Sequence, residues 1–163
     1  MSKRPETVPW ELNCLYILLS DRGWVGTFHW ALYLHQADLT GRLYHVVNRD
    51  DGIWKLEVME CANKIRAADL MAAVRIGVIL PEFFDMFDKG LSQATIRPHS
   101  PRSEEPFSCR TWAMDALIEL EQIGLIEIKD IAGLENETRA VGLMSGNRRM
   151  RDIFPVRTTL TAA

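Results

Sequence analysis

The segments TFHWALYLH at residues 27–35 and LYHVV at residues 43–47 decide the fold. The first segment is apolar and aromatic throughout, which is typical of a strand buried on both faces. A turn-forming segment at residues 37–42 separates the two. The pattern therefore predicts a hairpin that carries His29 on one strand and His45 on the other.

Other segments extend this hairpin into an antiparallel sheet. Their apolar and β-branched content, or their alternation between apolar and polar residues, is typical of strands. The strongest turn signal is Asp50-Asp51-Gly52, which follows the hairpin. The strands predicted in this way are Leu12–Ser20, Ile53–Met59, Met71–Leu80 and a short one at Leu125–Ile128.

The clearest helix is predicted at Phe107–Gly124, where apolar residues recur at helical spacing. Ser108 is a suitable N-cap and Gly124 a suitable C-terminal cap, which makes Cys109 the first helical residue. Shorter helical segments are predicted at Glu82–Lys89, at Glu135–Met144 and as one turn at Ala62–Ala68. The fold class predicted is therefore α+β, with an antiparallel sheet packed on the helix that carries Cys109.

Length and composition predict one globular domain over residues 1–163, with a flexible lead-in at 1–10 and an irregular tail at 152–163. The chain has 47% apolar and 25% charged residues and a net charge of −3, which argues against a basic nucleic-acid-binding surface over the whole domain. It contains neither an apolar run of membrane-spanning length nor a secretory signal pattern. A cytoplasmic protein without a stable membrane anchor is expected.

The three cysteines are Cys14, Cys61 and Cys109. This odd, sparse set contains no CxxC motif, which argues against a disulfide scaffold and a structural zinc site. No metal or cofactor site is predicted. Cys14 and Cys61 are interpreted as packing residues.

Cys109 has a position suited to catalysis. A thiol at a helix N-terminus lies at the positive end of the helix dipole, which favours the nucleophilic thiolate. A nearby imidazole can accept the thiol proton, and a second polar group can fix the tautomer of that imidazole. His29 and His45 are the candidates for these two roles, although a structural role is the commoner one for a single histidine or cysteine in such a position.

The string His29-Trp30-Ala31-Leu32-Tyr33-Leu34, followed by Tyr44-His45-Val46, resembles the first hairpin of the lecithin retinol acyltransferase family. The resemblance covers residues 26–48 and 107–124, and it includes an aromatic residue, Trp112, three positions after the cysteine. Small uncharacterised fungal domains with an HWALYL…FxCRxW pattern are similar as well. Ser108-Cys109-Arg110-Thr111 stands where the family usually has Asn-Cys-Glu-His, so lipid specificity is not carried over.

The resemblance implies a circularly permuted papain-like (NlpC-type) fold, in which the cysteine follows the histidines in the chain. It implies a Cys-His-His triad: Cys109 attacks an acyl carbonyl, His29 is the general base and acid, and His45 orients His29. The backbone amide of Cys109 would donate to the oxyanion. The implied activity is that of a cysteine-dependent hydrolase or acyltransferase that forms an acyl-enzyme with an amide, ester or thioester.

The substrate is expected to be a small molecule or a peptide or acyl compound. Trp30, Trp54 and Trp112 are interpreted as core residues or as walls of the substrate pocket. One alternative is a catalytically idle papain-like module that binds a partner or serves as an accessory protein. Another is a binder of nucleic acid or an acidic surface, which would use the basic residues Arg148, Arg149, Arg151 and Arg157.

Overall fold

The computed structural model describes residues 10–21, 27–49, 51–62, 70–92 and 96–147 of the 163-residue chain. The predicted basic cluster of Arg148, Arg149, Arg151 and Arg157, the tail at 152–163 and nearly all of the lead-in lie outside these residues.

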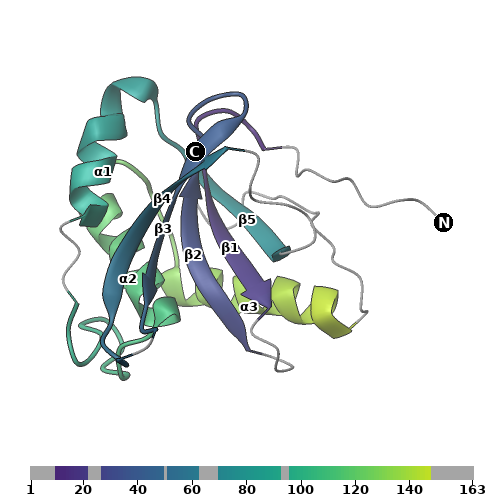
Figure 1. Cartoon of the computed structure of the whole chain (residues 1–163), viewed down its shortest axis with the longest axis vertical. Helices are drawn as coiled ribbons and strands as arrows, with labels where there is room; N and C mark the ends of the chain where they lie inside the picture. Colours follow the sequence, from purple (N-terminus) through teal and green to yellow (C-terminus); the bar gives the residue numbers. More distant parts are fainter. Residues whose placement is uncertain (1–9, 22–26, 50, 63–69, 93–95, 148–163) are drawn as a thin grey trace.

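A five-stranded antiparallel sheet forms the centre of the molecule (Figure 1). Its spatial order is β4-β3-β2-β1-β5, and every neighbouring pair is antiparallel. This confirms the predicted α+β class and the antiparallel sheet. The strands are β1 (Cys14–Asp21), β2 (Phe28–Leu34), β3 (Thr40–Val47), β4 (Lys55–Ala62) and β5 (Leu70–Val78).

The pairing of β2 with β3 is short. It joins Leu34 to Arg42, Tyr33 to Leu43 and Leu32 to Tyr44. By contrast, β3 pairs with β4 along its whole length, and β2 pairs with β1 back to Phe28. The start of β2 and the end of β3, which carry the two histidines, therefore lie beyond the last β2–β3 pair.

Both faces of the central strand β2 are buried. Alternate β2 side chains, including Trp30 and Leu32, belong to the larger core, which also contains the apolar face of the cysteine-bearing helix. The intervening Ala31 and Tyr33 belong to a second cluster, which includes Cys14. Because successive strand side chains point to opposite faces, this double burial explains why residues 27–35 lack polar alternation.

In the part of the chain that the structure describes, three α-helices accompany the sheet: α1 (Phe84–Ser92), α2 (Cys109–Gln122) and α3 (Ile131–Asn147). A short 3-10 helix, η1 (Pro81–Phe83), leads into α1. Helix α2 packs on β2 and β3, and α3 packs on β5, so that both lie behind the sheet in Figure 1.

Both ends of α2 are capped as the sequence predicts. At the start, the Thr111 N–H donates to Ser108 Oγ at 3.2 Å and the Ser108 N–H donates to Thr111 Oγ1 at 2.9 Å. At the end, Gly124 adopts a φ of +83°, and its N–H donates to the carbonyl of Glu121 at 2.9 Å. These caps fix Cys109 as the first residue of the helix.

Several predicted boundaries change. The strand predicted at Leu125–Ile128 is wrong: these residues form a loop with a single bridge residue at Ile128. Their alternation arises because Ile126 and Ile128 enter the larger core from this loop. The strand predicted at Ile53–Met59 begins instead at Lys55 and continues to Ala62, and residues 63–68 of the predicted helical turn lie outside the described residues.

The helix predicted at Glu135–Met144 is longer at both ends and begins at Ile131. Asp130 explains the earlier start, since its carboxylate accepts a hydrogen bond from the Gly133 N–H at 3.0 Å. Further along α3, Gly142 allows a close approach to the sheet. A Cβ atom there would lie 2.7 Å from Leu19 and 2.9 Å from Phe28.

Two helical glycines give a test of this packing. We predict that Gly142→Ala destabilises the protein by about 1–3 kcal/mol, because Leu19 and Phe28 are buried and have little room to move. Gly90→Ala in α1 is the matched control, because the nearest neighbour of the added Cβ atom would be Ile123 at 3.4 Å. The gain of roughly 0.5–1 kcal/mol in helix propensity should therefore make this variant more stable. Thermal unfolding measures both effects. Equal stability of the two variants would contradict the close approach of α3.

Candidate active site

His29 and His45 are in direct contact across the gap between β2 and β3. His29 Nε2 lies 2.7 Å from His45 Nδ1, and the two rings are inclined at 72°. His45 is only 5% exposed, whereas His29 is half-buried. The structure thus brings together the two histidines that the sequence singles out.

The contact continues to a carboxylate on β4. His45 and Glu57 face each other in the β3–β4 register, and His45 Nε2 lies 3.1 Å from Glu57 Oε1. The other carboxylate oxygen of Glu57 accepts a hydrogen bond from Arg49 Nη1 at 2.9 Å. The hydrogen bond with His45, followed by the charges of His45 and Arg49, lowers the pKa of Glu57 below its usual value.

Cys109 approaches the same place from α2. Its Sγ lies 4.0 Å from the carbonyl oxygen of Phe28, the residue directly before His29. Ser108 caps the N–H of Thr111 and leaves the N–H of Cys109, at the first helical position, without an intrahelical acceptor. The thiol therefore lies beside the start of β2, next to a backbone donor at the helix N-terminus.

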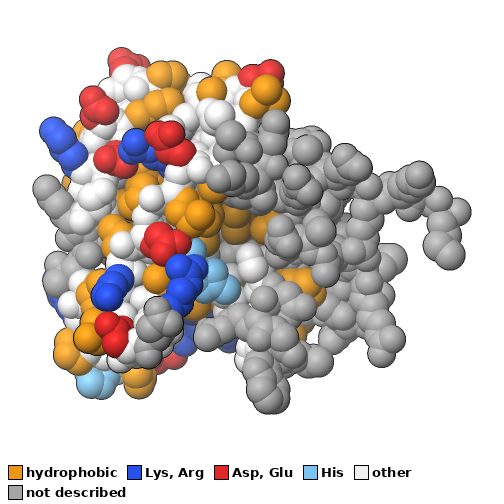
Figure 2. Space-filling view, viewed as in Figure 1, with side chains coloured by type: hydrophobic (Ala, Val, Ile, Leu, Met, Phe, Trp, Pro, Cys, Tyr) orange, Lys and Arg blue, Asp and Glu red, His pale blue; other side chains and the backbone are white. Residues whose placement is uncertain are grey.

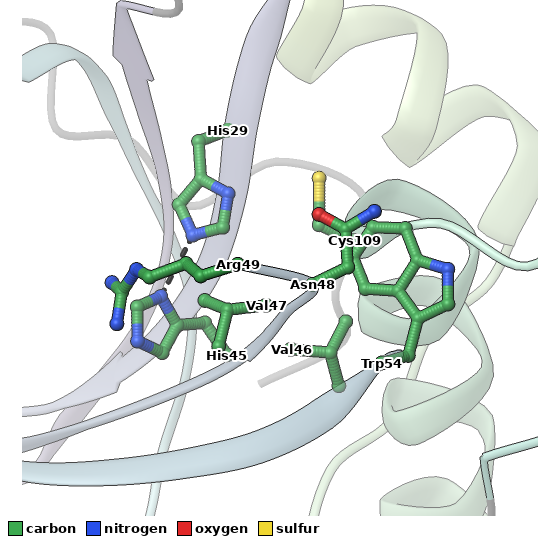
Figure 3. A pocket seen from close by; sticks show the side chains of 8 residues that line it. All are labelled: His29, His45, Val46, Val47, Asn48, Arg49, Trp54 and Cys109. Carbon is green, nitrogen blue, oxygen red and sulfur yellow. Dashed lines mark hydrogen bonds between the residues drawn. The ribbon is translucent and has the colours of Figure 1, made fainter. Parts of the chain in front are cut away.

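One pocket joins these groups. It has a volume of about 290 Å³ and is lined by His29, His45, Val46, Val47, Asn48, Arg49, Trp54 and Cys109. Figure 3 shows that the His29 ring nitrogen not bonded to His45 lies on the side of the Cys109 sulfur. On the face seen in Figure 2, a histidine side chain reaches the surface beside basic and acidic side chains.

The three tryptophans named as candidate pocket residues lie in different places. Trp54 lines the pocket and packs edge-on against Phe107, with ring centroids 5.4 Å apart. Trp30 is buried in the larger core. Trp112 is also buried there and borders a separate, smaller cavity beside Asp115, so neither of these two lines the pocket of Cys109.

Arg110, which follows Cys109, contributes to the scaffold. Its guanidinium pairs with Glu105 and lies 2.9 Å from Glu135 of α3. Arg102 binds the same Glu135 carboxylate at 2.8 Å. These ion pairs connect the first turn of α2 to α3 and to the loop before α2.

Three polar residues of the site were not predicted from the sequence: Asn48, Arg49 and Glu57. In the sequence, the first two simply precede a turn, and Glu57 is one of the polar residues of an alternating strand. A signal for Glu57 does exist in the sequence. In a hairpin centred on Asp51, each residue pairs with the one that lies equally far along the chain on the other side of Asp51. This pairing sets Glu57 opposite His45.

The other two cysteines and His35 lie apart from the site. Cys14 and Cys61 are buried in the second cluster, as expected for packing residues. His35 bonds to the Tyr33 hydroxyl at 2.7 Å, and burial lowers its pKa. Within the described residues, no group of three or more His, Cys, Asp or Glu side chains is placed to hold a metal ion.

The fold and the site define an α+β protein in which a Cys-His-His cluster lies where the first turn of α2 meets the sheet. Residues 15–127 match the profile of DUF6540, a family of unknown function, and the chain belongs to this family. No curated protein and no solved structure matches the chain. None of the helices in the described ranges has both the length and the apolar character needed to cross a membrane.

The site predicts selective alkylation of Cys109 in the native protein. Burial is the main cause that raises the pKa of the Cys14 thiol, so Cys14 stays protonated and unreactive at pH 7.5. Cys109 is only 2% exposed, but it lines the pocket beside His29 and should therefore react first with iodoacetamide, as read by peptide mass spectrometry. Cys14 and Cys61 should react only after denaturation. Modification of Cys14 before Cys109 would contradict this reading of the pocket.

Proposed function

We propose that the protein is a cysteine-dependent hydrolase or acyltransferase with a circularly permuted papain-like fold, which acts on an amide, ester or thioester. One observation carries the proposal: Cys109 and His29 line one pocket, while the far side of the His29 ring is bonded to His45. A nucleophile, a base and a group that orients the base are the minimum set for covalent acyl transfer.

In the first half of the proposed reaction, the Cys109 thiol proton moves to the ring nitrogen of His29 that does not contact His45. The sulfur then attacks the acyl carbonyl carbon, and the carbonyl electron pair moves to the oxygen. When the tetrahedral intermediate collapses, the bond to the leaving group breaks and His29 returns the proton to that group. The product at this stage is a thioester on Cys109.

In the second half, water or another acceptor attacks the thioester carbonyl while His29 accepts its proton. The thiolate of Cys109 is expelled and regains the proton from His29. Water as the acceptor gives hydrolysis, whereas an alcohol, amine or thiol gives transfer. Cys109, His29 and His45 have the same roles in both cases.

In this proposal, two donors at the pocket stabilise the oxyanion. The backbone N–H of Cys109 lacks an intrahelical acceptor because it belongs to the first turn of α2. Asn48 lines the pocket, and Figure 3 draws its carboxamide on the same side of the cavity as the sulfur, across from His29. Preorganised donors of this kind are worth more in a partly desolvated pocket than in water.

The pocket favours a compact acyl group or a short peptide segment as substrate. Its volume of about 290 Å³ lies just below the range of roughly 300–1,000 Å³ that is common for small-molecule sites. Trp54 and Val47 offer apolar surface on its wall, while Asn48 and Arg49 offer hydrogen-bond donors. A substrate with an apolar group beside a polar acyl carbonyl matches this lining.

Substitution of the triad tests the proposal on a panel of p-nitrophenyl esters, peptide amides and acyl thioesters. Cys109→Ala should abolish turnover and the acyl adduct seen by intact-protein mass spectrometry. His29→Ala should lower kcat/KM by about 10³-fold or more, and His45→Ala should leave a higher residual rate because His45 acts through His29.

Cys14→Ala and the exposed His99→Ala are the matched controls, since neither residue lines the pocket. Both should keep the activity of the unaltered protein. If a folded Cys109→Ala protein turned over a substrate as fast as the unaltered one, the proposal would fail. If the unaltered protein neither turned over nor acylated with any compound of the panel, the idle binding module would be the better description.

Asn48 gives a separate test of the oxyanion site. Asn48→Asp keeps the size of the side chain but replaces its amide donor with a negative charge. We expect kcat to fall by about 10²–10³-fold with little change in KM, because the donor acts on the charge that develops in the transition state. An effect on KM alone would assign Asn48 to substrate binding instead.

A further inference from the structure

We propose that Arg49 binds a carboxylate on the leaving group of the substrate, which makes an N-acyl amino acid the substrate class of this site. The inference rests on the proposed function, in which Cys109 is acylated while the leaving group departs. It assigns the specificity of the pocket to a residue outside the Cys-His-His set, and it says on which side of the pocket each half of the substrate lies.

Arg49 supplies the permanent charge of the pocket. The other described residues that line the pocket are two histidines, two valines, a cysteine, an asparagine and a tryptophan. The side chain of Arg49 is 63% exposed, so a ligand that enters the pocket can reach the guanidinium without a change in the fold. In this part of the chain the lining therefore offers one place where an anionic group gains a charge-assisted hydrogen bond.

Glu57 holds the guanidinium in position and leaves part of it available. Arg49 Nη1 donates to one oxygen of the Glu57 carboxylate at 2.9 Å, and the other oxygen lies 3.1 Å from His45 Nε2. Among the described residues, no acceptor is bonded to Nε or Nη2 of Arg49. These two nitrogens form one edge of the guanidinium, and their parallel N–H groups match the two oxygens of a carboxylate.

The charge of the pair favours a carboxylate over a phosphate. The lowered pKa of Glu57 keeps it ionised at neutral pH, so the single positive charge of Arg49 already faces one negative charge. A ligand carboxylate adds one further negative charge at the opposite edge of the guanidinium. A phosphate monoester adds a charge of about −1.5 to −2, which increases the repulsion from Glu57.

The position of the guanidinium assigns the carboxylate to the leaving group. Arg49 and His45 bind the same carboxylate, and Figure 3 draws the guanidinium beside the histidine rings, away from Cys109 and Trp54. In the proposed function His29 returns its proton to the leaving group, which therefore departs on the histidine side of the pocket. A carboxylate bound at Arg49 thus belongs to the departing half of the substrate.

The acyl half lies toward Trp54, whose ring packs edge-on against Phe107 and offers an apolar wall. In the first step the bond between the acyl carbon and the amide nitrogen breaks, and the sulfur of Cys109 forms a thioester with the acyl carbon. The nitrogen takes the proton from His29 and departs as the amine of the free amino acid. Water then attacks the thioester and releases the carboxylic acid.

Equilibrium binding to the Cys109→Ala protein tests the inference without turnover. Isothermal titration calorimetry compares N-hexanoylglycine with N-hexanoylglycinamide, which has the same size but no charge. At low ionic strength we expect the carboxylate to bind about 10-fold more tightly. This preference should shrink at about 0.5 M salt, because the charge of Arg49 is exposed to solvent. Equal affinities of the two compounds at low ionic strength would overturn the proposal.

Substitutions of Arg49 in the same Cys109→Ala background identify the group responsible. Arg49→Gln should remove the preference, and Arg49→Lys should retain only part of it because a lysine lacks the paired donors. Arg49→Gln combined with Glu57→Gln leaves the net charge of the pair unchanged but removes the guanidinium, so it should remove the preference as well. A preference that survives in Arg49→Gln would overturn the proposal.

Lys55→Gln is the matched control for the loss of a positive charge. Lys55 lies in the same hairpin, is 67% exposed and pairs with Asp51 at 3.4 Å, but it does not line the pocket. Its substitution should leave the preference for the carboxylate unchanged. N-hexanoyl-O-phosphoethanolamine tests the choice of anion and should bind more weakly than N-hexanoylglycine. Tighter binding of this phosphate would overturn the assignment of a carboxylate.

The failure of this inference can be distinguished from the failure of the proposed function. A preference that depends on Arg49, in a protein that acts on no acyl donor, would support the carboxylate site and refute the proposed function. Turnover of the ester, amide or thioester panel, together with equal affinities for the two glycine derivatives, would support the proposed function and overturn the carboxylate site.

Discussion

The hydrogen bond between His29 and His45 joins β2 to β3 beyond the point where the backbone pairing of these two strands ends. Strands β2 and β3 are joined by backbone bonds only as far as Leu32 and Tyr44. Beyond that point two imidazole rings bridge the strands, and the pocket lies beside them. The pocket thus lies beside the segments of β2 and β3 that are not paired with each other.

The helix that brings the thiol is fixed independently of the histidines. Ser108 and Thr111 define the start of α2 by a reciprocal cap, and Arg110 ties the first turn to Glu135 of α3. Because Glu135 is only 8% exposed, its pairing with two guanidinium groups is much less screened than a surface ion pair. The sulfur is thus held at the start of β2 by packing, capping and charge together.

Much of this arrangement could be predicted from local patterns. The hairpin, its two histidines and the helix that begins at Cys109 each have a signal within a few residues, namely apolar runs, turn residues and a cap. The loop at Leu125–Ile128 shows where local patterns fail, since alternation there reflects two side chains that enter a core formed by distant strands. Glu57 and Asn48 were missed for a related reason: their roles arise only from cross-strand register and from the shape of the pocket.

The register of the β3–β4 hairpin makes the contact between His45 and Glu57 depend on the length of the turn. Connecting loops usually tolerate insertions and deletions, because the strands on either side can still pair. Here a change of one residue between Val47 and Lys55 would shift the register and place Leu56 or Val58 opposite His45 in place of Glu57. The sheet would survive, but the histidines would lose their carboxylate. The length of this turn therefore matters to the site more than its amino-acid composition does.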